Sequence, residues 1–321
     1  MKIAALDLGT NSFLCLIAEV QDGRIKKIYS DQVEIVRLGQ GVNENKKFHP
    51  DALVRARASL SNFKKTIDEQ KPEAVLAMAT SAARDVSNAD ELFKIGRDLN
   101  IPIEIIPGEK EAEITYRGAL SSLDSLKIKN DPASLWAVID VGGGSTEIIV
   151  GTRDKVLGGG SLNLGGVRLT EKFFSNNGTD AVVSSEQINL CQRWIDQEIK
   201  KLLTELSGFS IANVLAVAGT PTELARAQQG MEIDQFVPEK IDGFVISQND
   251  LQNWVQKFAQ TTAQQRTHKY KINPGRADII LAGTMILNQT LAALGMQALT
   301  VSTRGVRYGV ALEMENRNKT S

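Results

Sequence analysis

Two segments in different halves of this 321-residue chain carry the same pattern. KIAALDLGTNSFLCLIAEV, near the N-terminus, aligns with WAVIDVGGGSTEIIVGTRD when Asp7 is placed on Asp140, and both copies then contain Asp-x-Gly-x-x-Ser. Each copy reads as an apolar strand that ends in Asp, a turn of small polar residues, and a second apolar strand. An internal repeat of this kind predicts two copies of one β-hairpin, one in each half of the chain.

Each predicted hairpin continues into a larger α/β unit. Asp22-Gly23 is a turn signal that predicts a third strand over 24–36. Arg153-Asp154 likewise precedes an expected strand over 155–164. Beyond each meander, helical patterns alternate with single apolar strands, which is typical of an α/β layer architecture. We expect helices at 51–70, 88–99, 184–206, 247–259, 276–294 and from 306, and strands at 74–79, 214–218 and 298–302.

A polar stretch separates the two halves. Residues 121–134, which include Asn130-Asp131-Pro132, break the periodicity. The segments 227–243 and 260–275 read as long surface loops. The expected domains are 1–124 together with about 305–321, and 125–304.

Both hairpin tips have the composition of an anion-binding turn. Small residues let backbone N–H groups converge on one point without a Cβ in the way, and such a nest attracts anions. The second tip, Gly142-Gly143-Gly144-Ser145-Thr146, adds two hydroxyl groups. A glycine-rich hairpin without a ligand is the alternative, and the occurrence of matching tips in both halves favours the anion site. Two tips that face each other across an interdomain cleft would hold a chain of phosphates.

Acidic residues near the tips are candidates for holding a metal. Phosphoryl transfer needs charge neutralisation and usually Mg²⁺, which binds one or two carboxylates, water and substrate phosphates. Asp7, Asp140 and Glu147 are the candidates. For Asp7 and Asp140, capping of a turn at the end of a strand is an open structural alternative. Glu147 lies inside an apolar strand, where an unpaired carboxylate would be costly.

The overall charge and the cysteine content exclude several classes of partner and site. The 37 basic and 38 acidic side chains give a net charge of -1, so any anion must bind at a local site and nucleic acid is not expected. Cys15 and Cys191 favour neither a disulfide framework nor a zinc cluster, which predicts a reducing compartment. No stretch approaches the roughly 20 apolar residues of a membrane span, and the apolar run after Lys2 is broken by Asp7 and Asn11. We therefore expect a cytoplasmic protein without a membrane partner.

Several stretches of the chain together form a specific pattern in their order and spacing. They are DLGTNSFLCLIAEV (7–20), ATSAARDVSNADEL (79–92), IPGEKEAEITYRGAL (106–120), DVGGGSTEIIVG (140–151), SLNLGGVRLTEKFF (161–174), AVAGTPTELA (216–225) and GRADIILAGTMIL (275–287). In these stretches the chain resembles the exopolyphosphatase/guanosine pentaphosphate phosphohydrolase family, the Ppx/GppA phosphatases, in a short two-domain form. The resemblance implies an α/β fold of duplicated actin-like ATPase (ribonuclease H-like) domains flanking an interdomain cleft.

The resemblance also implies roles for individual residues. Glu111, in GEKEA, matches the family's catalytic glutamate, proposed to activate the attacking water, and Arg84 matches a basic residue of the phosphate path. Asp140 and Glu147 match the acidic pair associated with catalysis and with the divalent metal, Mg²⁺ or Mn²⁺, and Asp7 is the third metal candidate. The positions assigned to substrate phosphates are Thr10, Asn11, Ser12, Gly143, Gly144, Ser145, Thr146, Gly219, Thr220 and Arg276.

The residues alone do not single out Glu111. Glu109, Glu111 and Glu113 share one expected helix, and a solvated acidic first turn is the leading interpretation for all three. Only the resemblance selects Glu111. Arg84 follows a buried strand in a turn of small residues, where its guanidinium could bind phosphate through two hydrogen bonds or form a surface ion pair.

Three positions depart from the family pattern. Pro107 stands where Ser is usual, Thr303 where Asp is usual, and Tyr308 where Glu is usual. These departures affect the expectations about the substrate and about the C-terminal wall of the site. They do not affect the expectations about the catalytic residues.

The implied activity is hydrolysis of the terminal phosphoanhydride of inorganic polyphosphate. Hydrolysis of pppGpp to ppGpp needs the same chemistry and is the alternative, and a non-catalytic phosphate or alarmone sensor is a third hypothesis from another class. Whether the chain forms a homodimer is left open. The chain ends at Ser321, without the helical C-terminal domains of longer relatives, and the loop 266–271 is the basic segment that could extend the site. On these grounds we expect a modest preference for short or medium polyphosphate.

Overall fold

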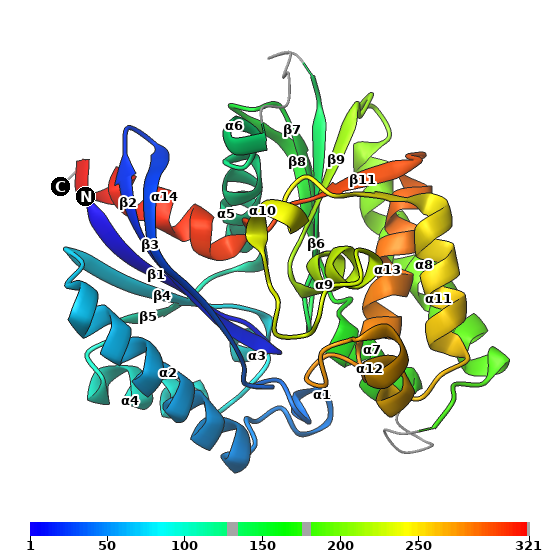
Figure 1. Ribbon diagram of the computed structural model, residues 1–321, viewed down its shortest axis with the longest axis horizontal. Helices are drawn as coiled ribbons and strands as arrows, with labels where there is room; N and C mark the ends of the chain where they lie inside the picture. Colours follow the sequence, from blue (N-terminus) through cyan, green and yellow to red (C-terminus); the bar gives the residue numbers. More distant parts are fainter. Residues whose placement is uncertain (127–133, 175–180, 320–321) are drawn as a thin grey trace. The chain divides into compact units, whose positions relative to one another are not determined.

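The computed structural model describes residues 1–126, 134–174 and 181–319 (Figure 1). The chain packs as two compact units, one formed by Met1–Ser121 with Arg304–Ser321 and the other by Ser122–Thr303. The expected linker tripeptide Asn130-Asp131-Pro132 lies outside the described residues. The expected domains, 1–124 with about 305–321 and 125–304, stay a prediction.

The first unit is built on a five-stranded sheet with the strand order β3-β2-β1-β4-β5. Its strands are β1 (Lys2–Leu8), β2 (Ser12–Gln21), β3 (Arg24–Ile35), β4 (Ala74–Ala79) and β5 (Ile103–Ile105). Its helices are α1 (Val42–Asn45), α2 (Pro50–Gln70), α3 (Ser81–Arg84), α4 (Ala89–Asp98), α5 (Gly108–Leu120) and α14 (Val306–Lys319). The first three strands form an antiparallel meander, and β4 and β5 continue the sheet in parallel with β1.

Alternation along β1 decides which helices cover which face of this sheet. Ala4 and Leu6 belong to a core shared with α2 and α4, whereas Ile3 and Ala5 belong to a core shared with α5 and α14. Figure 1 shows α2 and α4 on one side of the sheet and α14 on the other. By the same alternation Asp7, at the end of β1, lies on the α5 and α14 face.

The second unit has a six-stranded sheet with the order β10-β11-β9-β6-β7-β8. Its strands are β6 (Trp136–Val141), β7 (Thr146–Gly151), β8 (Val156–Leu162), β9 (Asn213–Val217), β10 (Val245–Ser247) and β11 (Ala298–Val301). Its helices are α6 (Leu123–Leu126), α7 (Gly166–Phe173), α8 (Ser185–Leu206), α9 (Gly219–Gln228), α10 (Pro238–Ile241), α11 (Gln248–Ala259), α12 (Ala263–Tyr270) and α13 (Ile280–Ala293).

The two sheets share one strand order. Strands β6 to β8 form an antiparallel meander like β1 to β3, and β9 and β11 then run parallel to β6 as β4 and β5 run parallel to β1. Strand β10 is an antiparallel addition at the edge. The fold is therefore α/β, with a duplicated arrangement of the actin-like (ribonuclease H-like) type, as the sequence predicts.

The sequence at the helix ends accounts for where the helices of the second unit begin. Helices α8, α11 and α12 each start with a capping box, in which a Ser or Thr side chain accepts from the third helical N–H and the side chain of that third residue accepts in return. For α12 these residues are Thr262 and Gln265. The expectation of a long loop over 260–275 was wrong, because this capping box and the buried Arg266 stabilise a helix there. The other expected loop, 227–243, contains the single turn α10.

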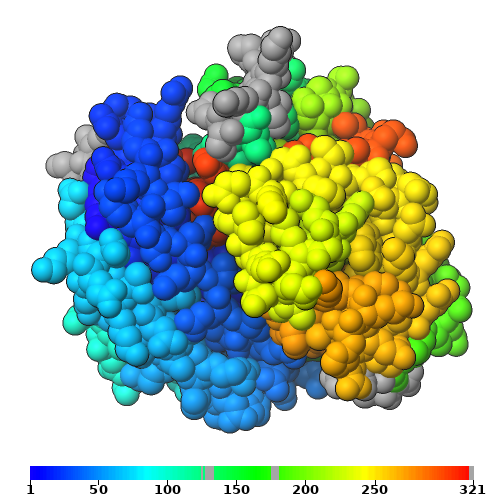
Figure 2. Space-filling model, in the orientation of Figure 1, coloured from blue at the N-terminus to red at the C-terminus, as the bar shows by residue number. Residues whose placement is uncertain are grey.

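The edge strand β3 carries both apolar and basic side chains on its surface. Ile28, Tyr29 and Val33 are exposed, and the strand lies on the face seen in Figure 2, where it is blue. Lys27 stacks over the ring of Tyr29, with Nζ 4.7 Å from the ring centre. Charged side chains on an edge strand oppose pairing with a further strand. Among the described residues no helix is both long enough and apolar enough to cross a bilayer.

Candidate active site

The tip of the β6–β7 hairpin is held from one side by helix α7. The carbonyl groups of Gly142, Gly143 and Gly144 all accept hydrogen bonds from the first turn of this helix. The donors are, in the same order, the N–H groups of Gly166 (2.9 Å) and Val167 (2.9 Å) and the Nε of Arg168 (2.7 Å). Helix α7 can approach this closely because it is preceded by Gly165, where a Cβ would lie 2.3 Å from the carbonyl oxygen of Gly143.

The N–H groups of the same peptides point the other way. In a planar trans peptide the C=O and the N–H lie on opposite sides, so the N–H groups of Gly143, Gly144 and Ser145 face away from α7. Within the described part of the chain none of these three groups has a hydrogen-bond acceptor. Neighbouring N–H groups without an acceptor form a nest suited to a phosphate oxygen.

The tip of the β1–β2 hairpin repeats this arrangement in the first unit. The N–H of Gly9 donates to the carbonyl of Ser12 (3.1 Å) and closes the turn, and the carbonyl groups of Thr10 and Asn11 accept from the segment after β3. The donors are the N–H of Gly39 (2.8 Å) to Thr10 and those of Val36 (3.0 Å) and Arg37 (2.8 Å) to Asn11. The repeat seen in the sequence is therefore a repeat of hydrogen bonding as well as of strand order.

Two of the predicted carboxylates lie on neighbouring strands. Asp140 on β6 is the register partner of Glu147 on β7, so both side chains project from the same face of the sheet. Both are buried, and Glu147 accepts a hydrogen bond from the hydroxyl of Ser161 on β8 (2.7 Å). Thr146 lies on the opposite face, where its hydroxyl donates to the carbonyl of Leu164 (2.8 Å). Its side chain is therefore engaged within the fold rather than at the surface of the loop.

This carboxylate pair fits a divalent cation. Like charges directly opposite each other on adjacent strands repel, and a bound cation relieves that repulsion. No group of three or more His, Cys, Asp or Glu residues in the described ranges is arranged to hold a metal by itself. Mg²⁺ is commonly held by one or two carboxylates together with water and substrate phosphates, which is the donor set that Asp140 and Glu147 can complete.

Asp7 interacts electrostatically with a buried arginine of the first unit. Arg307, at the start of α14, donates to both carboxylate oxygens of Asp31 on β3 (2.7 and 2.8 Å), and the hydroxyl of Tyr308 donates to the same carboxylate (2.9 Å). Burial opposes the charge on Arg307, but Asp31, and more weakly Asp7, hold the pKa of the guanidinium above its ordinary value. Asp7 thus feels the positive charge of Arg307. Tyr308, one of the departures from the family pattern, is part of this cluster.

Glu111 is the buried member of the acidic first turn of α5. It is 5% exposed, whereas Glu109 is exposed and Glu113 is half-buried. Arg84, in the short helix α3, donates through Nη1 to Glu111 (2.6 Å) and to the carbonyl of Ile106 (2.9 Å). Burial raises the pKa of the Glu111 carboxyl, and the charge and hydrogen bond of Arg84 offset part of that rise. The result is a carboxylate that is more basic than usual and held in one orientation.

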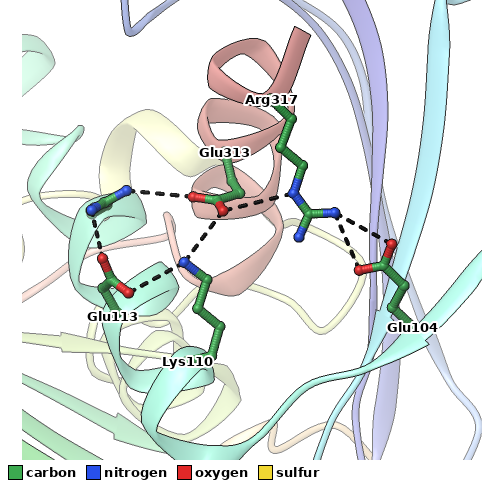
Figure 3. Close-up of polar contacts among 6 residues, drawn as sticks. Glu104, Lys110, Glu113, Glu313 and Arg317 are labelled. Atoms are coloured by element: carbon green, nitrogen blue, oxygen red, sulfur yellow. Dashed lines mark hydrogen bonds and ion pairs between the residues drawn. The ribbon is translucent and has the colours of Figure 1, made fainter. Parts of the chain in front are cut away.

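The flank of α5 next to Glu111 is tied to α14 and β5 by a network of ion pairs (Figure 3). Glu313 of α14 lies 3.3 Å from Nζ of Lys110 and 3.7 Å from Nε of Arg317, and Arg317 continues to Glu104 of β5 (3.2 Å). Lys110 also contacts Glu113 (3.2 Å). Single exposed pairs are worth little, but several that share partners restrain the helix that carries Glu111.

The two helices of this pair pack through glycines. A Cβ on Gly118 would lie 2.2 Å from the carbonyl oxygen of Gly305, and one on Gly309 would lie 1.9 Å from that of Ile114. Backbones in such close contact give helix α5 a rigid support. Helix α5 begins after Pro107, whose carbonyl accepts a hydrogen bond from the N–H of Glu111 (2.9 Å).

Arg276 lies directly over the start of α9. A Cβ on Gly219 would come within 1.8 Å of Nη1 of Arg276, so a larger residue there would displace the guanidinium from this position. The preceding residue, Ala218, has φ 75° and ψ -169°, a conformation that costs a non-glycine residue about 1–3 kcal/mol and is found mainly at functional sites. Burial lowers the pKa of Arg276, and the nearby Glu223 offsets part of that effect. Thr220 instead packs against Gly283 of α13.

Two cations of the basic segment 266–271 have partners within the second unit. Arg266 is buried and donates to the carbonyl groups of Phe258 and Ala277, and burial lowers its pKa to about 10. Lys271 is paired with Glu232. The charges of these two residues are therefore used within the second unit, and the statement that 266–271 could extend the site stays a prediction.

Three further residues next to the predicted site were missed from the sequence. Ser161, Arg168 and Arg307 all lie inside stretches or elements that the sequence singles out, but their contacts cross between elements. The strand register that opposes Ser161 to Glu147 would have found the first of them. No local signal indicates that Arg168 donates to Gly144 or Arg307 to Asp31.

Known proteins resemble the chain over nearly its whole length. The family model described as the Ppx/GppA phosphatase family matches residues 16–318. Exopolyphosphatase 2 of Mycobacterium tuberculosis is 31% identical, covering 98% of this chain and 98% of the relative. The bifunctional 3-dehydroquinate synthase/phosphatase of Fusobacterium nucleatum is 34% identical over 98% of this chain, and the chain spans 47% of that relative's length.

A solved structure agrees with the sequence relatives. An exopolyphosphatase-like protein superposes with a TM-score of 0.89 at 29% identity, covering 99% of this chain and 98% of the other. The family match, the relatives and the shared backbone all extend over both units. The chain belongs to the Ppx/GppA phosphatase family.

Proposed function

We propose that the chain is an exopolyphosphatase, which hydrolyses the terminal phosphoanhydride of inorganic polyphosphate and releases orthophosphate. The observation that carries the proposal is the Glu111–Arg84 pair: a buried carboxylate with a raised pKa, held by a guanidinium 2.6 Å away. A general base works best when its pKa approaches the working pH, and burial is a common way to raise a carboxylate pKa toward that range.

In the proposed step, Glu111 accepts a proton from water while the water oxygen forms a bond to the terminal phosphorus. The bond from that phosphorus to the bridging oxygen breaks, and the shortened chain leaves with both electrons. Charge builds on the phosphate oxygens, so the groups that surround them contribute by electrostatic stabilisation. Arg84 has further N–H groups beyond the one that holds Glu111, and we assign them to a phosphate oxygen.

The two hairpin tips and Arg276 are assigned to substrate phosphates. In the second unit the N–H groups of Gly143, Gly144 and Ser145 are the donors, and in the first unit the tip at 10–12 has the same build. Asp140 and Glu147, with Asp7 as the third candidate, would hold Mg²⁺ or Mn²⁺, which would neutralise phosphate charge when bound. We assign structural roles to the side chains of Thr146 and Thr220, because both pack against other parts of the second unit.

The choice of polyphosphate rests on relatives of similar length. Exopolyphosphatase 2 of Mycobacterium tuberculosis matches over nearly all of both chains. Hydrolysis of pppGpp is the second candidate, because the family includes guanosine pentaphosphate phosphohydrolases and the scissile bond is of the same kind.

The two cysteines fit a reducing compartment. Cys15 and Cys191 are buried free cysteines, and burial raises the pKa of each thiol to about 12. Thiols this weakly acidic do not form disulfides readily. We assign the protein to the cytoplasm, which is reducing.

Phosphate release from four substrates tests the proposal. Long polyphosphate, tripolyphosphate, pppGpp and ATP are compared with Mg²⁺ and with Mn²⁺, and Glu111→Gln is the inactive control. We expect the highest kcat/KM on a polyphosphate. A higher kcat/KM on pppGpp would transfer the assignment to the second candidate, and no release from any of the four would refute both.

A further inference from the structure

The glycine tip of the second unit depends on one side chain for its shape. Two of the three carbonyl groups that face α7 are held by backbone N–H groups of that helix, which substitutions other than proline leave in place. The third, that of Gly144, accepts from Nε of Arg168 at 2.7 Å. Arg168 is therefore the side chain through which the orientation of the Gly144–Ser145 peptide is controlled.

The hydrogen bond from Arg168 is important because residue 144 is a glycine. Without a Cβ, glycine populates many backbone conformations about equally, so the Gly144–Ser145 peptide has little preference of its own. Because C=O and N–H are fixed on opposite sides of the peptide, the bond to the Gly144 carbonyl also aims the N–H of Ser145 toward the nest. If that bond is lost, the peptide can rotate and the nest loses one of its three donors.

The matching tip of the first unit supports this interpretation by contrast. There Thr10 and Asn11 occupy the positions of Gly143 and Gly144, and backbone N–H groups hold both carbonyl groups. Their side chains also restrict the backbone, so the tip needs no direct side-chain clamp. Arg55 of α2 instead holds the segment after β3, by donating to the carbonyl of Val36 (2.7 Å).

We propose that Arg168 is a positioning residue for the reaction, which holds the Gly144–Ser145 peptide so that the N–H of Ser145 stabilises phosphate charge in the transition state. The proposal rests on the proposed function. Arg168 acts here through the loop, so the geometry of its Nε matters more than its charge. Lysine places its single ammonium one atom further along the side chain and does not reproduce that geometry.

The experiment compares Arg168→Met, which keeps the stem and removes the donors, with Arg168→Lys and Arg168→Ala. Lys172→Ala is the matched control, since it removes a cation from the same helix without touching the loop. Loss of one preorganised donor should lower kcat about tenfold to a hundredfold in Arg168→Met and Arg168→Lys, with KM changed less than about threefold. Millimolar guanidinium should restore part of the kcat of Arg168→Ala, and Lys172→Ala should behave as the wild type.

Several outcomes would overturn the proposal. Arg168→Lys with the activity of the wild type would show that charge suffices, and Arg168→Met with unchanged kcat would show that the loop holds its shape alone. A fall in kcat that only follows a lower Tm, without guanidinium rescue, would show a purely structural role. If the wild type hydrolyses nothing, the proposed function fails separately. Calorimetry with orthovanadate, which can mimic the five-coordinate phosphorus of the transition state, then decides: Arg168→Met must bind it more weakly than Lys172→Ala.

Discussion

Replacement of Glu111 by Gln separates catalysis from stability. Gln keeps the shape of the side chain and an oxygen that can accept from Arg84, but it cannot take a proton from water. Loss of a general base costs about 10² to 10⁴ in rate, which corresponds to about 2.7–5.4 kcal/mol of transition-state stabilisation. We therefore expect kcat to fall by that factor, with KM nearly unchanged because the cationic contacts to substrate remain.

The effect on stability should have the opposite sign. The folded-state pKa of Glu111 is raised, with burial as the largest cause. A carboxyl with a raised pKa favours the folded state at low pH, and this contribution is lost as the pH rises through the folded-state pKa. Above that pKa the ionised Glu111 weighs against folding, so Glu111→Gln should be at least as stable as the wild type at pH 8. The difference should shrink or reverse near pH 4.

The assays are phosphate release from polyphosphate and urea unfolding at both pH values. The kcat of the wild type should also rise with pH through the pKa of Glu111, and this limb should be absent from the residual activity of Glu111→Gln. A fall in kcat of less than tenfold would refute the role of Glu111 as the base. A variant less stable than the wild type at pH 8 would refute the inference that burial outweighs the attraction of Arg84.

Four other substitutions test the remaining parts of the site and its support. Asp140→Asn and Glu147→Gln should each raise the Mg²⁺ concentration that gives half-maximal phosphate release, because each removes a hard oxygen ligand. Gly219→Ala should lower kcat/KM about tenfold or more, since its Cβ would displace Arg276 and small misplacements are costly. Gly309→Ala should lower the free energy of unfolding by about 1–3 kcal/mol, despite the better helix propensity of Ala, because its Cβ would overlap a carbonyl oxygen of α5.

Gly208→Ala is a control for both glycine substitutions, because no atom lies within 4 Å of its Cβ position. Unchanged metal dependence in both carboxylate variants would place the metal elsewhere. Gly219→Ala with normal turnover would show that turnover does not need the position that Arg276 takes over Gly219. A stabilised Gly309→Ala would mean that α5 and α14 can separate without cost.

Local patterns of the sequence predict much of the fold. Apolar alternation and turn pairs predict the two meanders, and the strand expected at 74–79 is β4 as observed. Capping residues and apolar periodicity locate most helices to within a few residues. Helix α12 was missed because its residues are mostly polar, and the buried Arg266 that anchors it has partners only in the folded chain.

The candidate site divides in the same way. The repeated Asp-x-Gly-x-x-Ser tips and the carboxylates at their strand ends are visible in the sequence, because a hairpin brings neighbours in the chain together. Apart from the family resemblance, only the tertiary structure separates Glu111 from Glu109, since burial and the bond to Arg84 depend on packing between α3 and α5. The same holds for the bond from Arg168 to Gly144, which joins residues 24 positions apart. Local sequence sets backbone preference, but the pKa of a carboxyl and the orientation of a glycine peptide depend on atoms that folding brings from elsewhere in the chain.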